Sequence, residues 1–183
     1  MKDLRVLVPM FEGFEEIELV SIVDILRRAN IKTILASHSD FVAGTHNITI
    51  KADCNLSEID TKQFSAIILA GGYNGMLNLC NDSFIIKTLH EFNASNKLIA
   101  AICASPIVLD KAGVLKNKFS CYPSCKDSIT SNALYCEKDV VVDENIITAN
   151  GPISAMIFAL EIIKYLLNDE ASFSVAKDLL LKR

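Results

Sequence analysis

Cys103 is the residue of this sequence that combines a reactive side chain with a position suited to nucleophilic chemistry. It directly follows the apolar run 98–102, which is typical of a buried strand, and Pro106 then opens a helical pattern. A sharp strand-to-helix turn crowds the positions two before and two after its tip, and here these hold the small residues Ala101 and Ser105. The free N–H groups at a helix start stabilise a thiolate. The pattern predicts a nucleophile elbow with a lowered pKa for Cys103, against the simpler interpretation of an inert buried cysteine.

A glycine-rich loop follows another apolar run and is the second candidate element. Gly71, Gly72 and Gly75 lie within residues 69–75. Glycine lets backbone N–H groups approach a ligand without interference from a Cβ atom, so this loop could hold an oxyanion. A plain tight turn is the alternative, and a Gly-Gly pair alone favours it. The loop has neither a GxGxxG motif nor a Walker lysine, which argues against a nucleotide site.

Three glutamates, Glu15, Glu16 and Glu18, open the first helical pattern of the chain. Carboxylates in a first turn stabilise a helix through its dipole. Glu18 lies beside Leu19, at the edge of the apolar stripe. It is therefore either partly buried near the carboxyl edge of the sheet, where ligand sites of α/β proteins lie, or solvated, and both alternatives stay open. For Glu15 and Glu16 we expect a solvated surface.

The elements that must position these residues alternate between short apolar runs and longer segments of helical period. This alternation predicts a mostly parallel sheet with helices on both faces, in one domain covering residues 1–183. The predicted strands are 5–8, 32–36, 66–69, 98–102 and 146–148, with short strands near 134–135 and 140–142 in an otherwise irregular segment 119–145. The predicted helices are 15–29, with Asn30 in the left-handed conformation after it, a long helix beginning near Pro152, and 171–181.

Composition narrows the class of protein. The net charge is −4 and the basic residues are scattered, so nucleic-acid binding is not indicated. No apolar run is long enough for a membrane span and the N-terminus has no signal-peptide pattern, so we expect a soluble, cytoplasmic protein with reduced cysteines. Cys121 and Cys125 have no second ligand pair, and the three histidines form no ligand cluster in the sequence. We therefore expect no metal.

Together these segments resemble the DJ-1/PfpI (ThiJ) superfamily, and most closely its DJ-1 branch and bacterial YajL-type members. The resemblance rests on residues 100–104 around Cys103, the Gly71–Gly72 loop, residues 15–18, and the Asn-Gly-Pro turn at 150–152. It spans essentially the whole chain. It implies a flavodoxin-like three-layer sandwich, a homodimer and no cofactor.

The resemblance also implies roles for individual residues. Cys103 would be the reactive cysteine, and Glu18 a protonated carboxylic acid that hydrogen-bonds to the sulfur or to its sulfinate. The N–H groups of Gly72 and Ala104 would surround the sulfur and a substrate oxyanion. The substrate pocket would also include Gly71, Tyr122 and Pro152.

Three departures from the family pattern limit the expected chemistry. Protease-like members carry a histidine directly after the nucleophile, where this chain has Ala104, so a peptidase is not expected. Amidotransferase relatives need a late histidine, and none follows His90. In the animal DJ-1 branch a histidine approaches the cysteine from the segment matching 120–126, where this chain has Tyr122. That difference weakens the case for acid–base catalysis and leaves thiol redox chemistry open.

Two functions remain open at this point. The first is a cofactor-independent glyoxalase- or deglycase-type enzyme, a lyase or hydrolase that acts on small dicarbonyls such as methylglyoxal. The second is an oxidative-stress sensor and redox-regulated chaperone, in which peroxide converts Cys103 to a sulfinate without turnover. Cys121 or Cys125 could resolve an oxidised Cys103 as a disulfide. Thiazole phosphate synthesis is the historical label of the family, but no phosphate-binding motif in this sequence supports that function.

Overall fold

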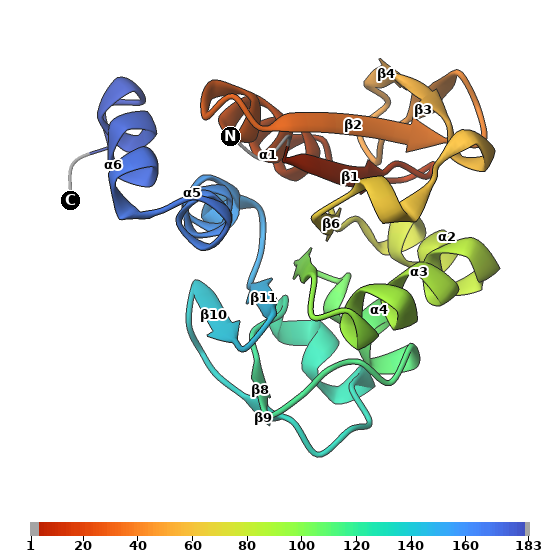
Figure 1. Ribbon diagram of the computed structural model, residues 1–183. Helices are drawn as coiled ribbons and strands as arrows, with labels where there is room; N and C mark the ends of the chain where they lie inside the picture. The colour runs from red at the N-terminus through yellow and green to blue at the C-terminus, as the bar shows by residue number, and fades with distance from the viewer. Residues whose placement is uncertain (1–3, 182–183) are drawn as a thin grey trace.

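A seven-stranded sheet forms the centre of the computed structural model, which describes residues 4–181 (Figure 1). Its strands are β1 (Arg5–Pro9), β2 (Lys32–Ser37), β5 (Cys54–Asn55), β6 (Ala66–Leu69), β7 (Leu98–Ile102), β10 (Val140–Asp143) and β11 (Ile146–Ala149). They lie in the order β10-β11-β7-β6-β1-β2-β5, and every pair is parallel except β10 with β11. Four of the five inner strands, β11, β7, β6 and β1, are almost entirely buried, as expected when both faces of a sheet are covered.

Helices cover both faces of this sheet and complete a flavodoxin-like α/β arrangement. On one face, α1 (Glu16–Arg28), α5 (Ala155–Leu166) and α6 (Asp169–Asp178) pack with Val6 and Val8 of β1. On the other face, α2 (Tyr73–Asn81), α3 (Ser83–Ala94) and α4 (Pro106–Lys111) pack with Leu7, because successive side chains of a strand point to opposite faces. Within residues 4–181, no helix is both long and apolar enough to cross a membrane.

Smaller elements surround this core. β3 (Phe41–Ala43) and β4 (Thr49–Lys51) form an antiparallel hairpin, and β8 (Lys118–Phe119) pairs with β9 (Leu134–Tyr135) in parallel. Four 3₁₀ turns complete the described chain: η1 (Leu56–Glu58), η2 (Thr61–Gln63), η3 (Pro123–Ser128) and η4 (Pro152–Ser154).

The predicted core elements are confirmed to within a few residues, including α1 and the left-handed Asn30, with a φ of 57°. The last long helix starts differently, because Pro152 opens a 3₁₀ turn and the α-helix begins only at Ala155. Several further elements were not predicted from the sequence, among them α2, α3, β5, β8 and the β3–β4 hairpin. α2 begins inside the glycine-rich loop, and Asp82 ends it and caps α3 by accepting a hydrogen bond from the Ile85 N–H.

The order of the strands determines where a site can form. From β1 the chain crosses to β2 on one side, whereas from β6 it crosses to β7 on the other. A crevice opens at the carboxyl end of a parallel sheet where the winding direction reverses, and ligands of such folds bind there. The segments that follow β1, β6 and β7 carry Glu18, the Gly71–Gly72 loop and Cys103 respectively. The topology thus gathers the three candidate elements at one edge.

Candidate active site

Cys103 occupies a strained turn between β7 and α4. Its φ of 63° is in the left-handed region, which a residue with a Cβ atom adopts only at a cost of about 1–3 kcal/mol. Hydrogen bonds hold this conformation from both sides. The Cys103 N–H donates to the Ala149 carbonyl at 2.9 Å, and the Tyr122 N–H donates to the Cys103 carbonyl at 2.8 Å. The sharp turn predicted around Cys103 is therefore present.

Glu18 is fully buried at the start of α1. Its Oε2 accepts a hydrogen bond from the Gly71 N–H at 2.7 Å, and its own N–H donates to Glu15 Oε2 at 2.8 Å. Its Oε1 has no hydrogen-bond partner of good geometry among residues 4–181. The Glu18 carboxyl also interacts with the Cys103 thiol: the thiol lowers the pKa of Glu18, and the carboxylate raises the pKa of Cys103. Of the two alternatives for Glu18, the buried one is correct.

Gly71 lies between the carboxyl and the cysteine and leaves no room for a side chain. A Cβ atom there would lie 2.6 Å from Cys103 Cβ and 2.6 Å from Glu18 Oε2. Any larger residue would therefore push apart the two groups that the site brings together. A second contact holds the same loop in place: the Ser105 hydroxyl donates to the Ala70 carbonyl at 2.6 Å. The sequence pattern identifies Ser105 only as a small residue, and its role in tying the two loops together was missed.

Two backbone N–H groups face the Cys103 sulfur. They belong to Gly72 and Ala104, and both favour negative charge on the sulfur by hydrogen bonding. Gly72 has a φ of 91°, and a Cβ atom there would lie 2.2 Å from the Gly13 carbonyl oxygen. The structure thus brings together Cys103, Glu18, Gly72 and Ala104, the residues for which the sequence predicts chemistry. The roles assigned to them stay predictions.

The two ionisable groups of the site have pKa values far from their ordinary ones. Burial raises the pKa of Glu18 to about 7, and the charge of Glu15 adds to this effect, while the Gly71 N–H and the Cys103 thiol oppose it. Burial also raises the pKa of the Cys103 thiol, and the neighbouring Glu18 carboxylate raises it further. The prediction of a lowered thiol pKa was wrong. The enclosing core and the carboxylate outweigh the two N–H groups, so the sulfur retains its proton at neutral pH.

The raised pKa of Glu18 makes stability depend on pH. The pKa is about 7 in the folded protein and 4.5 in an ordinary environment. The neutral buried carboxyl therefore contributes fully below about pH 4.5, and this contribution is lost as the pH rises through 7. The loss reaches about 3 kcal/mol above pH 8. Urea unfolding of the wild type and Glu18→Gln between pH 4.5 and 8.5 should give a difference that changes by this amount. Parallel profiles would contradict the raised pKa.

Tyr122 and Pro152, expected to line the pocket, are connected to Cys103 in different ways. The Tyr122 backbone adjoins Cys103, because its N–H donates to the Cys103 carbonyl, but the residue is 46 % exposed. A Cβ atom at Gly151 would lie 3.3 Å from the ring carbon Cδ2 of Tyr122, so the ring lies beside the turn that leads into Pro152. Pro152 is half-buried. The structure therefore brings Tyr122 to the rim of the site and Pro152 near Tyr122.

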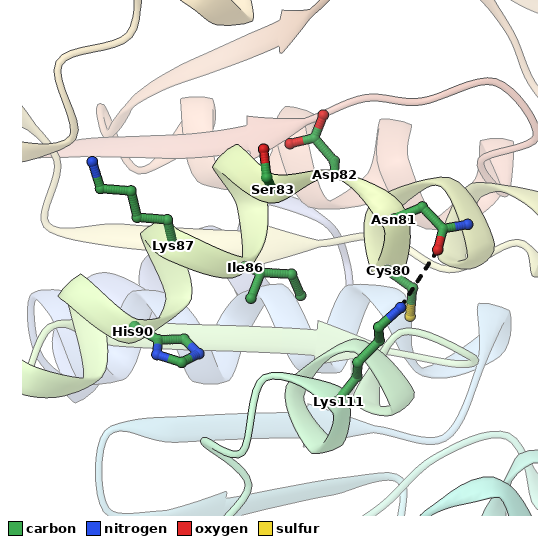
Figure 2. A pocket seen from close by; sticks show the side chains of 8 residues that line it. All are labelled: Cys80, Asn81, Asp82, Ser83, Ile86, Lys87, His90 and Lys111. Atoms are coloured by element: carbon green, nitrogen blue, oxygen red, sulfur yellow. Dashed lines mark hydrogen bonds between the residues drawn. The ribbon is translucent and has the colours of Figure 1, made fainter.

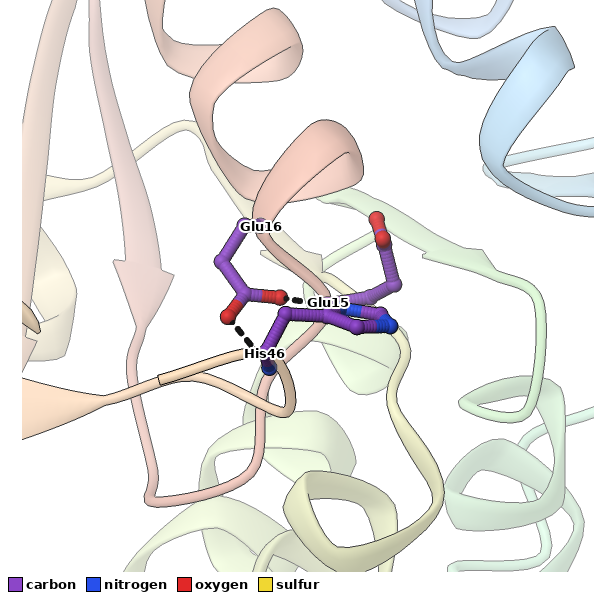
Figure 3. Close-up of side chains that lie close together, drawn as sticks. All are labelled: Glu15, Glu16 and His46. Carbon is purple, nitrogen blue, oxygen red and sulfur yellow. Dashed lines mark hydrogen bonds and ion pairs between the residues drawn. The ribbon is translucent and has the colours of Figure 1, made fainter. Parts of the chain in front are cut away.

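Glu15 and Glu16 are buried, and the expectation of a solvated surface was wrong. They are only 8 % and 5 % exposed. Glu16 Oε1 accepts a hydrogen bond from the His46 N–H at 2.6 Å, and Glu16 Oε2 lies 3.0 Å from His46 Nδ1 (Figure 3). The β3–β4 hairpin thus covers the start of α1, which local sequence patterns do not reveal. Glu15, Glu16 and His46 offer three ligand atoms close together, but the Glu16 oxygens already have protein partners.

The other cysteines and histidines lie in separate environments. The Cys121 thiol donates to the Tyr122 carbonyl at 3.3 Å, and burial together with Cys125 raises its pKa to about 12. The resolving-cysteine hypothesis for Cys121 and Cys125 stays a prediction. His38 pairs with Asp82 at 2.8 Å, and His90 lines a pocket on α3.

Comparison with known proteins gives consistent results. The model of the DJ-1/PfpI family matches residues 4–165. The Drosophila melanogaster protein dj-1beta is 37 % identical in sequence, with 96 % of each chain covered. The crystal structure of Drosophila melanogaster DJ-1beta superposes on this structure with a TM-score of 0.94 at 36 % identity, and the match covers 98 % of this chain and 99 % of that chain. A Caenorhabditis elegans protein named glutathione-independent glyoxalase DJR-1.2 is 33 % identical, with 100 % of this chain and 98 % of that protein covered. A solved structure of oxidized DJ-1 from Toxoplasma gondii has a TM-score of 0.94 at 36 % identity and covers 98 % of this chain and 100 % of that chain.

Proposed function

Because this chain belongs to the DJ-1/PfpI family, we propose that it is a cofactor-independent glyoxalase that converts small dicarbonyls such as methylglyoxal to hydroxy acids such as lactate. The observation that carries the proposal is the pairing of a nucleophilic side chain with a carboxyl group whose pKa lies near neutral pH. The Glu18 carboxyl faces the Cys103 thiol, and its pKa is about 7. A general base is most effective when its pKa lies near the working pH. The relative named as a glutathione-independent glyoxalase supports the same choice.

The first step joins the sulfur to the aldehyde carbon. In the fraction of molecules with an ionised Glu18, the carboxylate takes the thiol proton while the sulfur attacks. The carbon–sulfur bond forms, and the π electrons of the carbonyl move to its oxygen. The N–H groups of Gly72 and Ala104, which face the sulfur, stabilise this developing oxyanion. Glu18 then returns the proton to the oxygen, which leaves a hemithioacetal on Cys103.

The second step is an isomerisation followed by hydrolysis. Glu18 removes the hydrogen of the former aldehyde carbon as a proton, and an enediolate forms under the same N–H groups. The proton is delivered to the adjacent carbon while the hydroxyl proton of the former aldehyde carbon passes to the second oxygen. The product is a thioester of the 2-hydroxy acid. Water adds to this thioester, the carbon–sulfur bond breaks, and the thiol regains a proton. The net reaction adds one water to methylglyoxal and yields lactate, without an external oxidant or reductant.

Lactate formation from methylglyoxal by the purified protein, with no added thiol or metal, tests this proposal. The ionised form of Glu18 is the base, so kcat/KM should rise with pH through an apparent pKa of about 7 and level off above it. Lactate and residual methylglyoxal are measured between pH 5.5 and 8.5 against buffer alone. Lactate no faster than in buffer would reject the glyoxalase function, and a rate that falls over this range would reject Glu18 as the base.

An oxidative-stress sensor with redox-regulated chaperone activity is the second candidate. A carboxyl with a pKa of about 7 is protonated often enough to donate a hydrogen bond to a Cys103 sulfinate, and the Toxoplasma gondii relative is described in its structure as oxidized. Intact-mass measurement during peroxide titration separates the two functions. A sensor forms sulfinate on Cys103 at low peroxide excess and makes no lactate from methylglyoxal. A glyoxalase forms lactate before oxidation and loses this activity in proportion to the fraction of Cys103 that is oxidised.

We also propose that two copies of the chain associate through an exposed apolar patch, defined here as Ile17, Val20 and Ile48. These side chains are 59 %, 50 % and 55 % exposed, although all three are aliphatic. The patch joins α1 to the β3–β4 hairpin, since the Ile48 N–H lies 3.4 Å from Glu16 Oε1. A cytoplasmic location stays a prediction, supported by six unpaired cysteines.

Placing a charge in this patch should break the dimer. Val20→Glu places a carboxylate in the apolar contact, where burial without a partner is unfavourable, so the variant is expected to be monomeric. Light scattering coupled to size-exclusion chromatography measures the mass of each variant. Tyr165→Glu, at a partly exposed position on α5 outside the patch, is the control. A wild-type monomer, or a Val20→Glu dimer as stable as the wild type, would contradict this assignment.

A further inference from the structure

A closed ring of hydrogen bonds joins Glu15, Glu18 and Gly71. The Glu18 N–H donates to Glu15 Oε2 at 2.8 Å, the Gly71 N–H donates to Glu18 Oε2 at 2.7 Å, and the Glu15 N–H donates to the Gly71 carbonyl at 3.0 Å. Each of the three residues therefore donates one hydrogen bond and accepts one within the ring. The ring fixes the start of α1 against the glycine-rich loop, where the Glu18 carboxyl enters the site.

Glu15 takes part in this ring through both its backbone and its side chain. It directly precedes α1, and its carboxylate caps the helix, whose first N–H groups have no partner inside the helix. The capped N–H is that of Glu18 itself, so the bond restrains the backbone from which the Glu18 side chain extends. Glu15 is only 8 % exposed, and a hydrogen bond to a carboxylate is strong when water is excluded.

The Glu18 side chain depends on this restraint because it has few contacts of its own. Its Oε2 accepts from the Gly71 N–H, and its Oε1 has no hydrogen-bond partner of good geometry among residues 4–181. Its direction is therefore set by the position of its own backbone and by that of Gly71. A base must lie within hydrogen-bond reach of the proton that it takes, so a small shift of either segment would separate the carboxyl from the Cys103 thiol.

The Glu15 carboxylate also acts on Glu18 through its charge. Burial has the largest effect on the pKa of Glu18 and raises it; the Gly71 N–H and the Cys103 thiol lower it, and the charge of Glu15 raises it. A like charge nearby disfavours the ionised form of a carboxyl. Glu15 thus favours the neutral form of Glu18.

Glu16, the neighbouring buried carboxylate, takes no part in the ring. In Figure 3 both dashed contacts join Glu16 to His46, and neither reaches Glu15. Glu16 therefore ties α1 to the β3–β4 hairpin, whereas Glu15 ties α1 to the loop that carries Gly71. Two carboxylates adjacent in the sequence thus hold different parts of the fold, and that of Glu15 acts on the candidate active site.

We propose that Glu15 is a positioning residue of the active site, which holds the Glu18 carboxyl toward Cys103 by closing the hydrogen-bond ring with Gly71. The expected effect on the rate rests on the glyoxalase function. The effect on the ring does not, because the Gly71 N–H can be observed in the free protein by NMR.

Glu15→Ala and Glu15→Gln test the proposal. Glu15→Ala opens the ring, so the Gly71 amide proton should exchange with solvent about tenfold faster, and kcat should fall by about 10- to 100-fold with little change in KM. The amide oxygen of Glu15→Gln can still accept from the Glu18 N–H, so this variant should restore both properties. Because it removes the charge, its kcat/KM should rise at lower pH than that of the wild type.

Asp82→Ala is the matched control for the loss of a helix cap. Asp82, labelled in Figure 2, caps α3 in the same way, by accepting from the N–H of Ile85 at 2.9 Å. It follows α2, whose nine residues separate it from Gly72 by about 13 Å. This variant should lose stability in urea unfolding as Glu15→Ala does. It should keep the wild-type kcat and the wild-type exchange of the Gly71 amide.

Three results would overturn the proposal. The first is an unchanged exchange rate of the Gly71 amide in Glu15→Ala, which would show that the ring does not depend on the Glu15 side chain. The second is an equal effect of Asp82→Ala, which would assign the loss to stability alone. The third is a failure of Glu15→Gln to restore the Gly71 exchange. If the wild type forms no lactate, the glyoxalase function fails, and the Gly71 exchange in the three variants still decides this proposal.

Discussion

Glu18→Gln is expected to lower kcat for lactate formation from methylglyoxal by about 100- to 10,000-fold, the usual contribution of a general acid–base group. The amide of glutamine can still accept the hydrogen bond from the Gly71 N–H, which Glu18 Oε2 accepts at 2.7 Å, so the loop should stay in place. It cannot take a proton from the thiol or from carbon. KM should change little, since the carboxyl is fully buried and acts on the reacting atoms.

Glu12→Gln is the matched control for this variant. Glu12 lies in the same segment before α1, but its side chain is exposed, so this variant should retain the wild-type rate. Steady-state kinetics at pH 8 and urea unfolding are measured for both variants. Full activity in Glu18→Gln would show that the carboxyl only supports the fold. Equal losses in the two variants would point to a general effect of charge.

Gly72→Ala is expected to destabilise the protein by about 3 kcal/mol and to reduce activity strongly. The φ of 91° is unfavourable for any residue with a Cβ atom, and the added atom would lie 2.2 Å from the Gly13 carbonyl oxygen and 2.7 Å from the Glu15 nitrogen. Both are backbone atoms, so no flexible side chain can move aside. The loop must shift instead, and the shift moves the Gly72 N–H away from the Cys103 sulfur.

Gly113→Ala separates the two causes of this loss. Gly113 also has a positive φ, of 64°, but a Cβ atom there would meet nothing within 4 Å. This control should therefore cost only about 1 kcal/mol, from the backbone conformation, and should leave the rate unchanged. Urea unfolding and kinetics of the two variants give the comparison. If Gly72→Ala costs no more than Gly113→Ala, the close approach of the two loops is not significant for stability.

The central sheet could be predicted because its signals are local. Buried strands such as Ala66–Leu69 and Leu98–Ile102 are short apolar runs, and α1 carries an apolar stripe of helical period. α2 lacks such a signal, since Gly72 directly precedes its first residue and Gly75 lies inside it, and glycines usually indicate a turn. Its helical state depends on packing against α4 and α3, which a local pattern does not contain.

The electrostatics of the site could not be predicted, for the same reason. Cys103 at a strand-to-helix turn suggests a lowered pKa when only its neighbours in the sequence are considered. The carboxylate that opposes this effect is Glu18, from a distant segment, and the burial that dominates comes from the whole fold. Glu16 gives a similar lesson, because the hairpin residue His46 covers it from 30 positions away. The positions of these groups follow from topology, and their pKa values follow from their positions.

The decisive experiment compares lactate formation from methylglyoxal by the wild type and Cys103→Ala, with Cys136→Ala as the control thiol variant. The proposed mechanism requires that the Cys103 sulfur form the bond to the aldehyde carbon. It predicts steady lactate formation by the wild type and Cys136→Ala, and a rate for Cys103→Ala that equals buffer alone. Lactate formation by Cys103→Ala at the wild-type rate would contradict the mechanism, because the reaction would then proceed without the thiol.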